Sequence, residues 1–310
     1  MNDLFPNPLV QLSIGMQQRV AFLLGSLAYF FWFYFFVGFR PEHAGLYITV
    51  VGLYVAWPGT RRFVLAFGAF IVYWMIYDSL RILPNYMVNP IHVLEPYLIE
   101  KNWFGINGPN QQIITLNEYF AVHTNTLLDV LTGFFYLGWV PVPLAFGAWL
   151  FANDKALFVR FSYAFLFTNL LGFVIYYLYP AAPPWYIELH GFEVKHGTPG
   201  NAAGLLNFDA FFGIQLFADM YKKNANVFAA IPSLHSAYPV LCLLYGRHLG
   251  KWWLNLVFTI FVAGIWFAAV YSRHHYIIDV LAGGATALLG YCLFEFLAQQ
   301  TRLKYWLNSL

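Results

Sequence analysis

Two short motifs in the C-terminal third of the chain decide how it can fold, IPSLH at residues 231–235 and SRHHYIID at residues 272–279. Both contain histidine, and the second also contains an aspartate, in a chain that is otherwise poor in ionisable groups. Long apolar runs separate and follow the two motifs. The fold therefore has to bring two histidines and a carboxylate together within an apolar environment.

The composition indicates an integral membrane protein. Of the 310 residues, 60% are hydrophobic and only 10% are charged, whereas charged residues make up about 25% of an ordinary soluble domain. The net charge is only +2 and the basic residues are scattered, which argues against a nucleic-acid partner. The first apolar run lacks a small-residue cleavage site, so we expect it to be retained as a spanning helix.

The chain predicts an all-α, polytopic membrane helix bundle with about eight transmembrane helices. A helix needs about 20 apolar residues to cross the hydrocarbon core, and the second and third apolar runs are short enough to be either two crossings or one re-entrant pair. The eight predicted segments are residues 19–39, 44–57, 63–77, 126–151, 157–179, 233–245, 252–270 and 276–298.

Polar stretches separate some of these segments. Residues 78–125 are amphipathic and contain prolines, which places them outside the lipid or along its surface. Prolines end the fifth segment near residue 180, and the loop that follows is expected to contain a short amphipathic helix at about residues 208–221. We expect one integrated membrane domain, with an N-terminal part at residues 1–125 and a catalytic core at residues 126–310.

The basic residues of the short connections predict the orientation, because such residues mark the cytoplasmic side. Eight crossings place both termini on that side and the long loops, together with the turn at residues 273–275, on the other. The active site is therefore expected on the non-cytoplasmic face, which is the periplasmic face of a bacterial inner membrane or the lumenal face of a Golgi membrane. The basic residues on the predicted cytoplasmic side are Arg19, Arg61, Arg62, Lys155, Arg160, Arg247, Lys251, Arg302 and Lys304.

The two histidine motifs should meet, because His235 and His275 each lie at the start of a predicted helix on the same face of the membrane. Asp279 follows His275 by four residues, which puts the two side chains on one helical face. A carboxylate bonded to one ring nitrogen of histidine makes the other nitrogen a better base or nucleophile. We expect His274 to be a neighbour that faces the interface rather than a third catalytic group.

The predicted chemistry is phosphoryl transfer without a metal or another cofactor. Helix N-termini bind phosphate through free amides and the positive end of the helix dipole, and two such ends would face one pocket. The sequence contains no acidic cluster or Cys/His set of the kind that holds a metal. Two other interpretations remain open: a structural ion pair between His275 and Asp279, and a proton relay or ligand contact in a transporter or receptor. Residues 183–185, Pro-Pro-Trp, are either part of the site or a helix terminator with an interfacial aromatic.

These motifs resemble the type 2 phosphatidic acid phosphatase (PAP2) superfamily, whose second motif is Pro-Ser-Gly-His and whose third motif ends in His-x-x-x-Asp before a glycine-containing helix. The sequence motifs Pro-Pro-Trp, Ser-Leu-His and His-His-Tyr are similar to those of the inositol phosphorylceramide synthase (aureobasidin-target) branch. Residues 77–81, with His92 and Glu95 downstream, also resemble that branch. The resemblance implies a PAP2-like core of six helices.

The resemblance also implies roles for individual residues. His275 would be the nucleophile that forms a phosphohistidine, Asp279 would orient it, His235 would act as acid and then as base, and Ser233 would help to hold phosphate. The chain departs from the phosphatases at two places. Ile175 and Ala182 stand where their first motif has Lys and Arg, and Arg273 precedes the nucleophile by two residues rather than six.

The cations that hold the substrate are therefore not fixed by the resemblance. Arg273 is one candidate, Arg81 with its neighbour Asp78 is another, and Lys222 with Lys223 is a third. The resemblance implies a phosphotransferase that moves inositol phosphate from phosphatidylinositol to a ceramide-like acceptor and releases diacylglycerol. A lipid phosphate phosphatase that uses water as the acceptor is the alternative within the same family, and the donor head group stays open among inositol, ethanolamine and choline phosphates.

Overall fold

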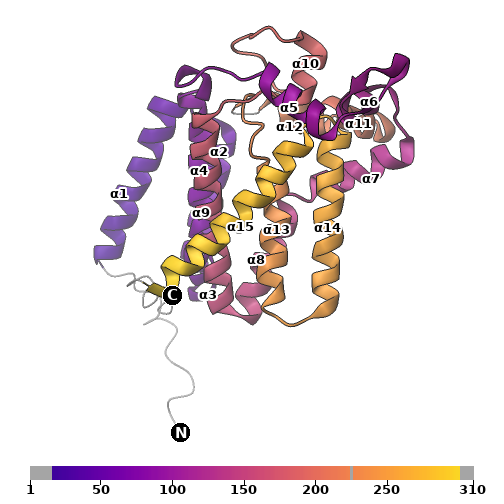
Figure 1. Cartoon of the computed structure of the whole chain (residues 1–310). Coiled ribbons are helices and arrows are strands. Elements are labelled where there is room, and N and C mark those ends of the chain that lie inside the picture. Colours follow the sequence, from indigo (N-terminus) through magenta and orange to yellow (C-terminus); the bar gives the residue numbers. More distant parts are fainter. Residues whose placement is uncertain (1–15, 224–225, 301–310) are drawn as a thin grey trace. The chain divides into compact units, whose positions relative to one another are not determined.

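The computed structural model describes residues 16–223 and 226–300 and is mostly helical (Figure 1). Its contacts divide the chain into two compact units, Met1–Ile82 and Leu83–Leu310. The predicted functional division at residue 125 stays a prediction, and Arg302 and Lys304 of the predicted cytoplasmic side lie outside the described residues.

The first unit consists of consecutive helices. Proline occupies the first position of both α2 and α3, where its missing amide hydrogen costs no helical hydrogen bond. The third predicted segment is a pair of helices, α3 and α4, bent by 50°. The elements are α1 (Met16–Trp32) with a π-helical turn (Phe33–Val37), α2 (Pro41–Ala56), α3 (Pro58–Ala66), α4 (Gly68–Ser79) and a 3-10 turn (Leu80–Ile82).

The second unit contains six bundle helices. Its fourth predicted segment is wrong as a single helix, because the chain bends by 43° between α7 and α8. Pro141 begins α8 and has no amide hydrogen with which to continue the hydrogen bonds of α7. The bundle helices are α7 (Thr126–Leu137), α8 (Pro141–Asn153), α9 (Lys155–Leu178), α13 (Leu234–Arg247), α14 (Trp252–Tyr271) and α15 (Ile277–Gln300).

Three of these helices, α9, α14 and α15, are long and apolar enough to cross a membrane. The number of candidate membrane spans among the described residues rises to five if the pairs α3–α4 and α7–α8 each form one span. The chain is therefore a multi-pass membrane protein. The count of eight crossings stays a prediction, since α13 has only 14 residues.

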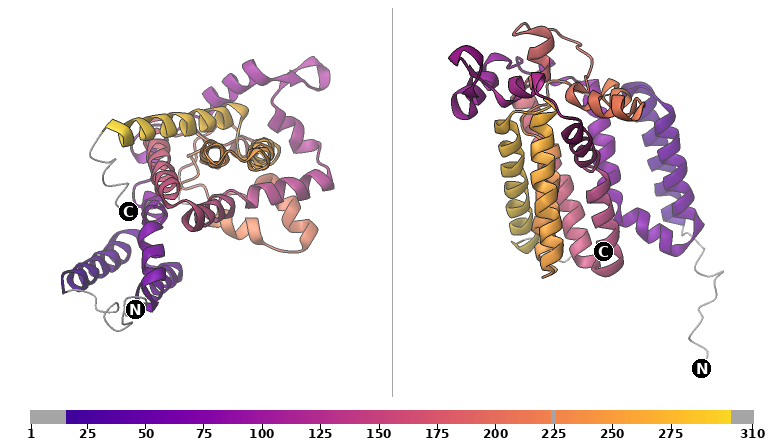
Figure 2. Two further views of the ribbon diagram at one scale, coloured as in Figure 1. Left: turned by 90° about the horizontal axis from the view of Figure 1, so that it is seen from below. Right: turned by 90° about the vertical axis from the view of Figure 1, so that its right-hand side faces the viewer.

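Short elements of the second unit gather at the end of the bundle where α15 begins (Figures 1 and 2). The predicted helix at residues 208–221 is in fact two helices, α11 and α12, because Gly213 adopts a left-handed φ of +66° that ends the first of them. The elements are η3 (Asn85–Met87), α5 (Leu94–Phe104), β1 (Ile106–Asn107) paired antiparallel with β2 (Ile113–Ile114), η4 (Pro109–Gln111), α6 (Leu116–Val122), α10 (Pro184–His190), η5 (Ala203–Leu205), α11 (Leu206–Phe212) and α12 (Leu216–Lys222).

Helix α13 packs against α8, α9, α14 and α15 and is the centre of the bundle. Its residues Ala237, Leu241 and Tyr245 are fully buried. The approach of α15 is close because Gly283 has no side chain, and a Cβ there would lie 2.1 Å from the carbonyl oxygen of Ser233. This contact brings the first turn of α13 beside the first turns of α15, and so places the two histidine motifs next to each other.

Candidate active site

The two predicted catalytic histidines meet at the start of these helices. His235 lies in the first turn of α13, and His275 lies in the turn between α14 and α15. Nδ1 of His235 is 3.3 Å from Nε2 of His275. His275 is only 5% exposed, whereas His235 is partly buried and packs edge-on against Trp139. Residues separated by 40 positions are thus within reach of one small reacting group.

Asp279 lies behind His275, on the side away from His235. Its Oδ2 is 3.4 Å from Nδ1 of His275 and accepts a hydrogen bond of 2.9 Å from the backbone N–H of Tyr276. The carboxylate is fully buried. The contact with Nδ1 has the length of an ion pair without the alignment of a hydrogen bond, so Nδ1 has no hydrogen-bond partner among the described residues. The carboxylate can therefore orient the ring while it also caps the first turn of α15.

Burial favours the neutral form of the histidines in the turn. It lowers the pKa of His275 to about 4, partly offset by a hydrogen bond with the backbone of Ala230. It also lowers the pKa of His274, and the charge of His275 lowers it further. At neutral pH His275 is consequently an uncharged imidazole, which is the form that can act as a nucleophile.

Ser233 connects the two motifs. Its hydroxyl oxygen caps α13 by accepting hydrogen bonds from the amide and the hydroxyl of Ser236, and its backbone N–H donates to the carbonyl oxygen of Asp279. The next two amides, of Leu234 and His235, have no acceptor in the part of the chain that the structure describes. They are the free donors at this site.

The expectation of a second free helix start is wrong. The amides of Ile277 and Ile278, at the beginning of α15, both donate to the carboxylate of Glu100, and the preceding amide of Tyr276 donates to Asp279. These groups are already satisfied by carboxylates, which also oppose the approach of a phosphate. The first two amides of α15 are therefore occupied, whereas the amides of Leu234 and His235 in α13 are free.

Arg273 adopts a left-handed backbone conformation, with a φ of +64°. Its Nε lies 3.0 Å from Oε2 of Glu188 in α10. Its side chain lines a cavity of about 250 Å³ together with Tyr97, Glu118 and Tyr276. The pairing with Glu188 partly neutralises the guanidinium, and its role in holding substrate stays a prediction.

Asp78 and Arg81 belong to the first unit. Asp78 is 5% exposed and accepts hydrogen bonds from Arg40 at 2.5 Å and from Arg81 at 2.7 Å, with a ring nitrogen of His43 at 2.9 Å. The four side chains form a polar cluster within that unit. A substrate-binding role for Asp78 and Arg81 stays a prediction. The alternative cation Lys222 lies in the second unit, is exposed and pairs with Asp219 at 3.7 Å.

The expectation that His274 faces the interface is wrong. This side chain is only 4% exposed, and its Nε2 lies 3.0 Å from the carbonyl oxygen of Ala202. Its ring stacks on Tyr221 with a centroid distance of 4.3 Å. The contact with Ala202 and the stacking on Tyr221 hold this side chain inside the protein.

Trp185 is not an interfacial aromatic either. Its side chain is 3% exposed and packs with Val93, Tyr186 and Phe228. Its backbone N–H donates to the carbonyl oxygen of Arg273 at 3.0 Å, so the Pro-Pro-Trp segment holds the turn that carries His275.

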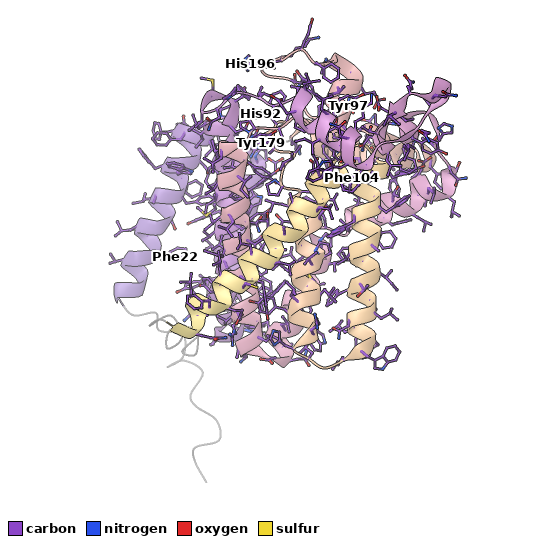
Figure 3. All side chains as sticks on the ribbon, in the orientation of Figure 1. Phe22, His92, Tyr97, Phe104, Tyr179 and His196 are labelled. Carbon is purple, nitrogen blue, oxygen red and sulfur yellow. The ribbon has the colours of Figure 1, made fainter. Side chains whose placement is uncertain are left out.

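His92, which the family resemblance singled out, binds the backbone of the segment that precedes Pro-Pro-Trp. Its backbone N–H donates to the carbonyl oxygen of Pro180, and its own carbonyl accepts from the N–H of Ala182. Its ring stacks on Tyr179 with a centroid distance of 4.0 Å (Figure 3). His92 therefore fixes the segment that leads into Pro-Pro-Trp.

Two further residues at the site were not predicted individually. Glu100 of α5 binds the first amides of α15, and the side-chain amide of Asn117 in α6 donates to the carbonyl oxygens of Val270 and His275. Glu100 and Ile277 are 177 positions apart. No local pattern connects residues so distant along the chain, and only the polar character of residues 78–125 marked this stretch as a place for functional groups.

Within residues 16–223 and 226–300, no group of three or more His, Cys, Asp or Glu side chains is arranged to hold a metal ion. Metal-independent catalysis stays a prediction.

Comparison with known proteins identifies relatives along most of the chain. The family model of the PAP2 superfamily matches residues 112–293. The phosphoinositol dihydroceramide synthase of Bacteroides thetaiotaomicron is 48% identical over 263 residues, which cover 84% of this chain and 86% of that protein. No solved structure matches.

Fungal relatives are longer than this chain. The inositol phosphorylceramide synthase of Candida albicans is 34% identical over 61% of this chain and 39% of its own length. The inositol phosphorylceramide synthase catalytic subunit of Saccharomyces cerevisiae is 28% identical over 81% of this chain and 60% of its own length. The family model covers more than half of the chain, the bacterial relative matches over most of both proteins, and the histidine pair lies within the matched region, so the chain belongs to the PAP2 superfamily.

Proposed function

We propose that this protein is a membrane lipid phosphotransferase that moves inositol phosphate from phosphatidylinositol to a ceramide-like acceptor and releases diacylglycerol. The observation that carries the proposal is the contact between His235 and His275 with Asp279 behind it. The names of the relatives in Bacteroides and in fungi support a sphingolipid product. The bacterial relative in particular favours dihydroceramide as the acceptor.

In the first step Nε2 of His275 attacks the phosphorus of phosphatidylinositol. An N–P bond forms and the P–O bond to diacylglycerol breaks. His235, which the entering phosphodiester anion favours in its protonated form, gives its proton to the leaving alkoxide. Because the reacting nitrogens are 3.3 Å apart in this structure, the phosphate has to enter between them and replace their contact. Asp279 stabilises the positive charge that develops on the ring of His275.

In the second step the now neutral His235 removes the proton of the acceptor hydroxyl. The acceptor oxygen attacks phosphorus and the N–P bond breaks. The product, an inositol phosphorylceramide-like lipid, leaves, and His275 returns to its neutral form. Two displacements at one phosphorus give overall retention of its configuration. Exclusion of water from a pocket that opens to lipid would favour the lipid alcohol over hydrolysis.

The free amides at the start of α13 are the donors proposed to hold the phosphate. Those of Leu234 and His235 have no other acceptor among the described residues, and the positive end of the helix dipole lies at the same place. The hydroxyl of Ser233, which accepts hydrogen bonds from Ser236, can still donate its own proton to a phosphate oxygen. Backbone donors thus compensate for the two cations that Ile175 and Ala182 replace.

The active site is proposed to face the non-cytoplasmic side of the membrane. Within the second unit, the short connections α8–α9 and α13–α14, with Lys155 and Lys251 beside them, lie at the opposite end of the bundle from the start of α15 (Figure 1). Basic short connections favour the cytoplasm.

The first test separates transfer from hydrolysis. Purified protein is given labelled phosphatidylinositol with dihydroceramide, and separately phosphatidic acid, and the products are identified by mass. A new inositol phospholipid in the first reaction is expected. Free phosphate from phosphatidic acid, with no new inositol lipid, would instead establish the phosphatase alternative. No turnover of either lipid by folded protein would favour a transporter or receptor.

The second test detects the proposed covalent intermediate. Brief incubation with donor labelled in the phosphate and without acceptor should label the protein through a bond that is stable in base and labile in acid. His275→Ala should remove the label, whereas His248→Ala, at an exposed histidine that contacts Tyr291, should retain it. Label or full activity in the His275→Ala protein would contradict the assignment of the nucleophile.

A further inference from the structure

The turn that carries His275 is held by backbone hydrogen bonds from elements outside the bundle. Trp185 of α10 and Gly204 of η5 donate their amides to the carbonyl oxygens of Arg273 and Ser272. Asn117 of α6 donates to the carbonyl oxygen of His275 at 2.9 Å. Each bond fixes the backbone of the turn and leaves the side chain of His275 free to face His235.

Glu100 fixes the other side of the catalytic pair, the first turn of α15. Its Oε1 accepts from the N–H of Ile277 at 3.0 Å, and its Oε2 accepts from the N–H of Ile278 at 3.1 Å. The side chain is fully buried. Two charge-assisted hydrogen bonds from one rigid carboxylate define both the position and the rotation of the helix end.

The location of this cap matters because Asp279 is the residue that follows Ile278. The amide of Tyr276 also binds Asp279, so one helical turn contains both the cap and the carboxylate behind His275. A displacement of about 1 Å at reacting groups costs up to about 100-fold in rate. Glu100 lies outside residues 112–293, the part matched by the family model.

We propose that Glu100 is a positioning residue for the phosphotransfer reaction, which sets the orientation of Asp279 and His275 by binding the first two amides of α15. The proposal rests on the proposed function only for the choice of substrate. Glu100 contacts no reacting atom, and it acts through the backbone of the helix.

The ionisation of Glu100 should make its positioning role depend on pH. Burial raises the pKa of Glu100 to about 7, with the two amides opposing the rise and the charge of Asp279 adding to it. Tyr276 also lies near this charge: burial raises the pKa of Tyr276, and the charges of Asp279, Glu100, Tyr97 and Glu118 raise it further. Only the ionised carboxylate presents two acceptor oxygens to two donors, since the neutral acid uses one oxygen as a hydroxyl donor. The cap is therefore complete only above a pH of about 7.

The test compares Glu100→Gln and Glu100→Ala with wild type and with Glu95→Gln as the control. Glu95 lies on the same helix, but its side chain is 60% exposed. We expect kcat to fall about 10- to 100-fold for Glu100→Ala and by less for Glu100→Gln, which retains one acceptor, with KM changed by less than about twofold. The Glu95→Gln protein should match wild type. Each rate is measured with whichever phosphoryl transfer the wild type performs, including hydrolysis of phosphatidic acid.

The pH dependence separates positioning from a purely structural role. The titration of the histidines is common to both proteins, so it cancels in the ratio of wild-type kcat to Glu100→Gln kcat. That ratio should rise through a pH of about 7. A constant ratio, an unchanged kcat in both Glu100 variants, or failure of both variants to fold would overturn the proposal. Lack of inositol phosphate transfer by the wild type, with these differences still seen in hydrolysis, would count against the proposed function alone.

Discussion

At the scale of single residues, Asp279 combines a structural and a chemical contact. Its carboxylate caps the amide of Tyr276 and lies 3.4 Å from Nδ1 of His275. The charge stabilises an imidazolium or a phosphorylated ring, whereas the cap requires only an acceptor oxygen. The two functions can therefore be separated by a substitution that retains the oxygen and removes the charge.

Asp279→Asn is expected to reduce kcat by about 10²- to 10⁴-fold while the protein remains folded. The amide oxygen can still accept from Tyr276, but it no longer stabilises positive charge on His275. Steady-state rates and thermal unfolding in detergent measure the two effects. Asp209→Asn is the matched control, because Asp209 is also buried and accepts two backbone amides, from Phe217 and Ala218. Equal losses of activity in both variants would show that Asp279 acts only through stability.

Sequence patterns predict the histidine pair and Asp279 because these residues depend on local spacing and on matched helix starts. The spacing His-x-x-x-Asp predicted the contact, although His275 lies in the turn two residues before α15 begins and the two residues do not share a helix. The burial of His274 and the cap by Glu100 depend on contacts between segments far apart in the chain, such as the bond from His274 to Ala202. A single sequence contains no information about such pairings.

At the scale of elements, the sequence predicted long apolar helices well and broken ones poorly. The segment at residues 157–179 is α9, and those at residues 252–270 and 276–298 are α14 and α15, each within a few residues. The apolar run at residues 126–151 has no polar break, so the bend before Pro141 was missed. A glycine in a left-handed conformation likewise divided the predicted helix at residues 208–221. Apolarity identifies burial in lipid, but backbone chemistry determines where a helix ends.

The crossing of α13 and α15 depends on Gly283. A methyl group there would lie 2.1 Å from the carbonyl oxygen of Ser233, a backbone atom that cannot move alone. We expect Gly283→Ala to separate the two histidine motifs, to destabilise the protein by about 1–3 kcal/mol and to lower kcat. Gly284→Ala is the control on the same helix, since its methyl would meet only the side chain of Trp266. A smaller effect at Gly283 than at Gly284 in unfolding and activity assays would contradict this account.

The cap on α15 predicts a pH dependence of stability that is opposite in sign to that of activity. The pKa of Glu100 is raised to about 7 from an ordinary value of 4.5, so the folded state binds a proton more tightly than the unfolded chain does. This contribution to stability is complete below a pH of about 4.5 and is lost as the pH rises through about 7. Glu100→Gln cannot ionise, and its melting temperature relative to wild type should increase between pH 5 and pH 8. A constant difference over that range would contradict the raised pKa.

At the scale of the whole molecule, composition predicted the class of protein and the motifs predicted the reaction centre, while the orientation in the membrane still rests on the distribution of charge. In the second unit the polar elements and the histidine pair lie at the end of the bundle where α15 begins, and the turn between α8 and α9 lies at the opposite end (Figure 1). Single cysteines at the two ends can therefore report which end faces the cytoplasm.

Lys195→Cys and Asn153→Cys are suitable positions, because both residues are exposed, the first after α10 and the second at the end of α8. The native Cys292 is exposed and is first replaced by Ser, whereas Cys242 is buried and can remain. In intact cells or sealed vesicles of known orientation, a membrane-impermeant thiol reagent should label Lys195→Cys from the non-cytoplasmic side, and Asn153→Cys only after the membrane is permeabilised. The protein with only Cys242 is the blank. Labelling with the reverse order would place His275 on the cytoplasmic face, and the lipid donor would then have to be drawn from the cytoplasmic leaflet.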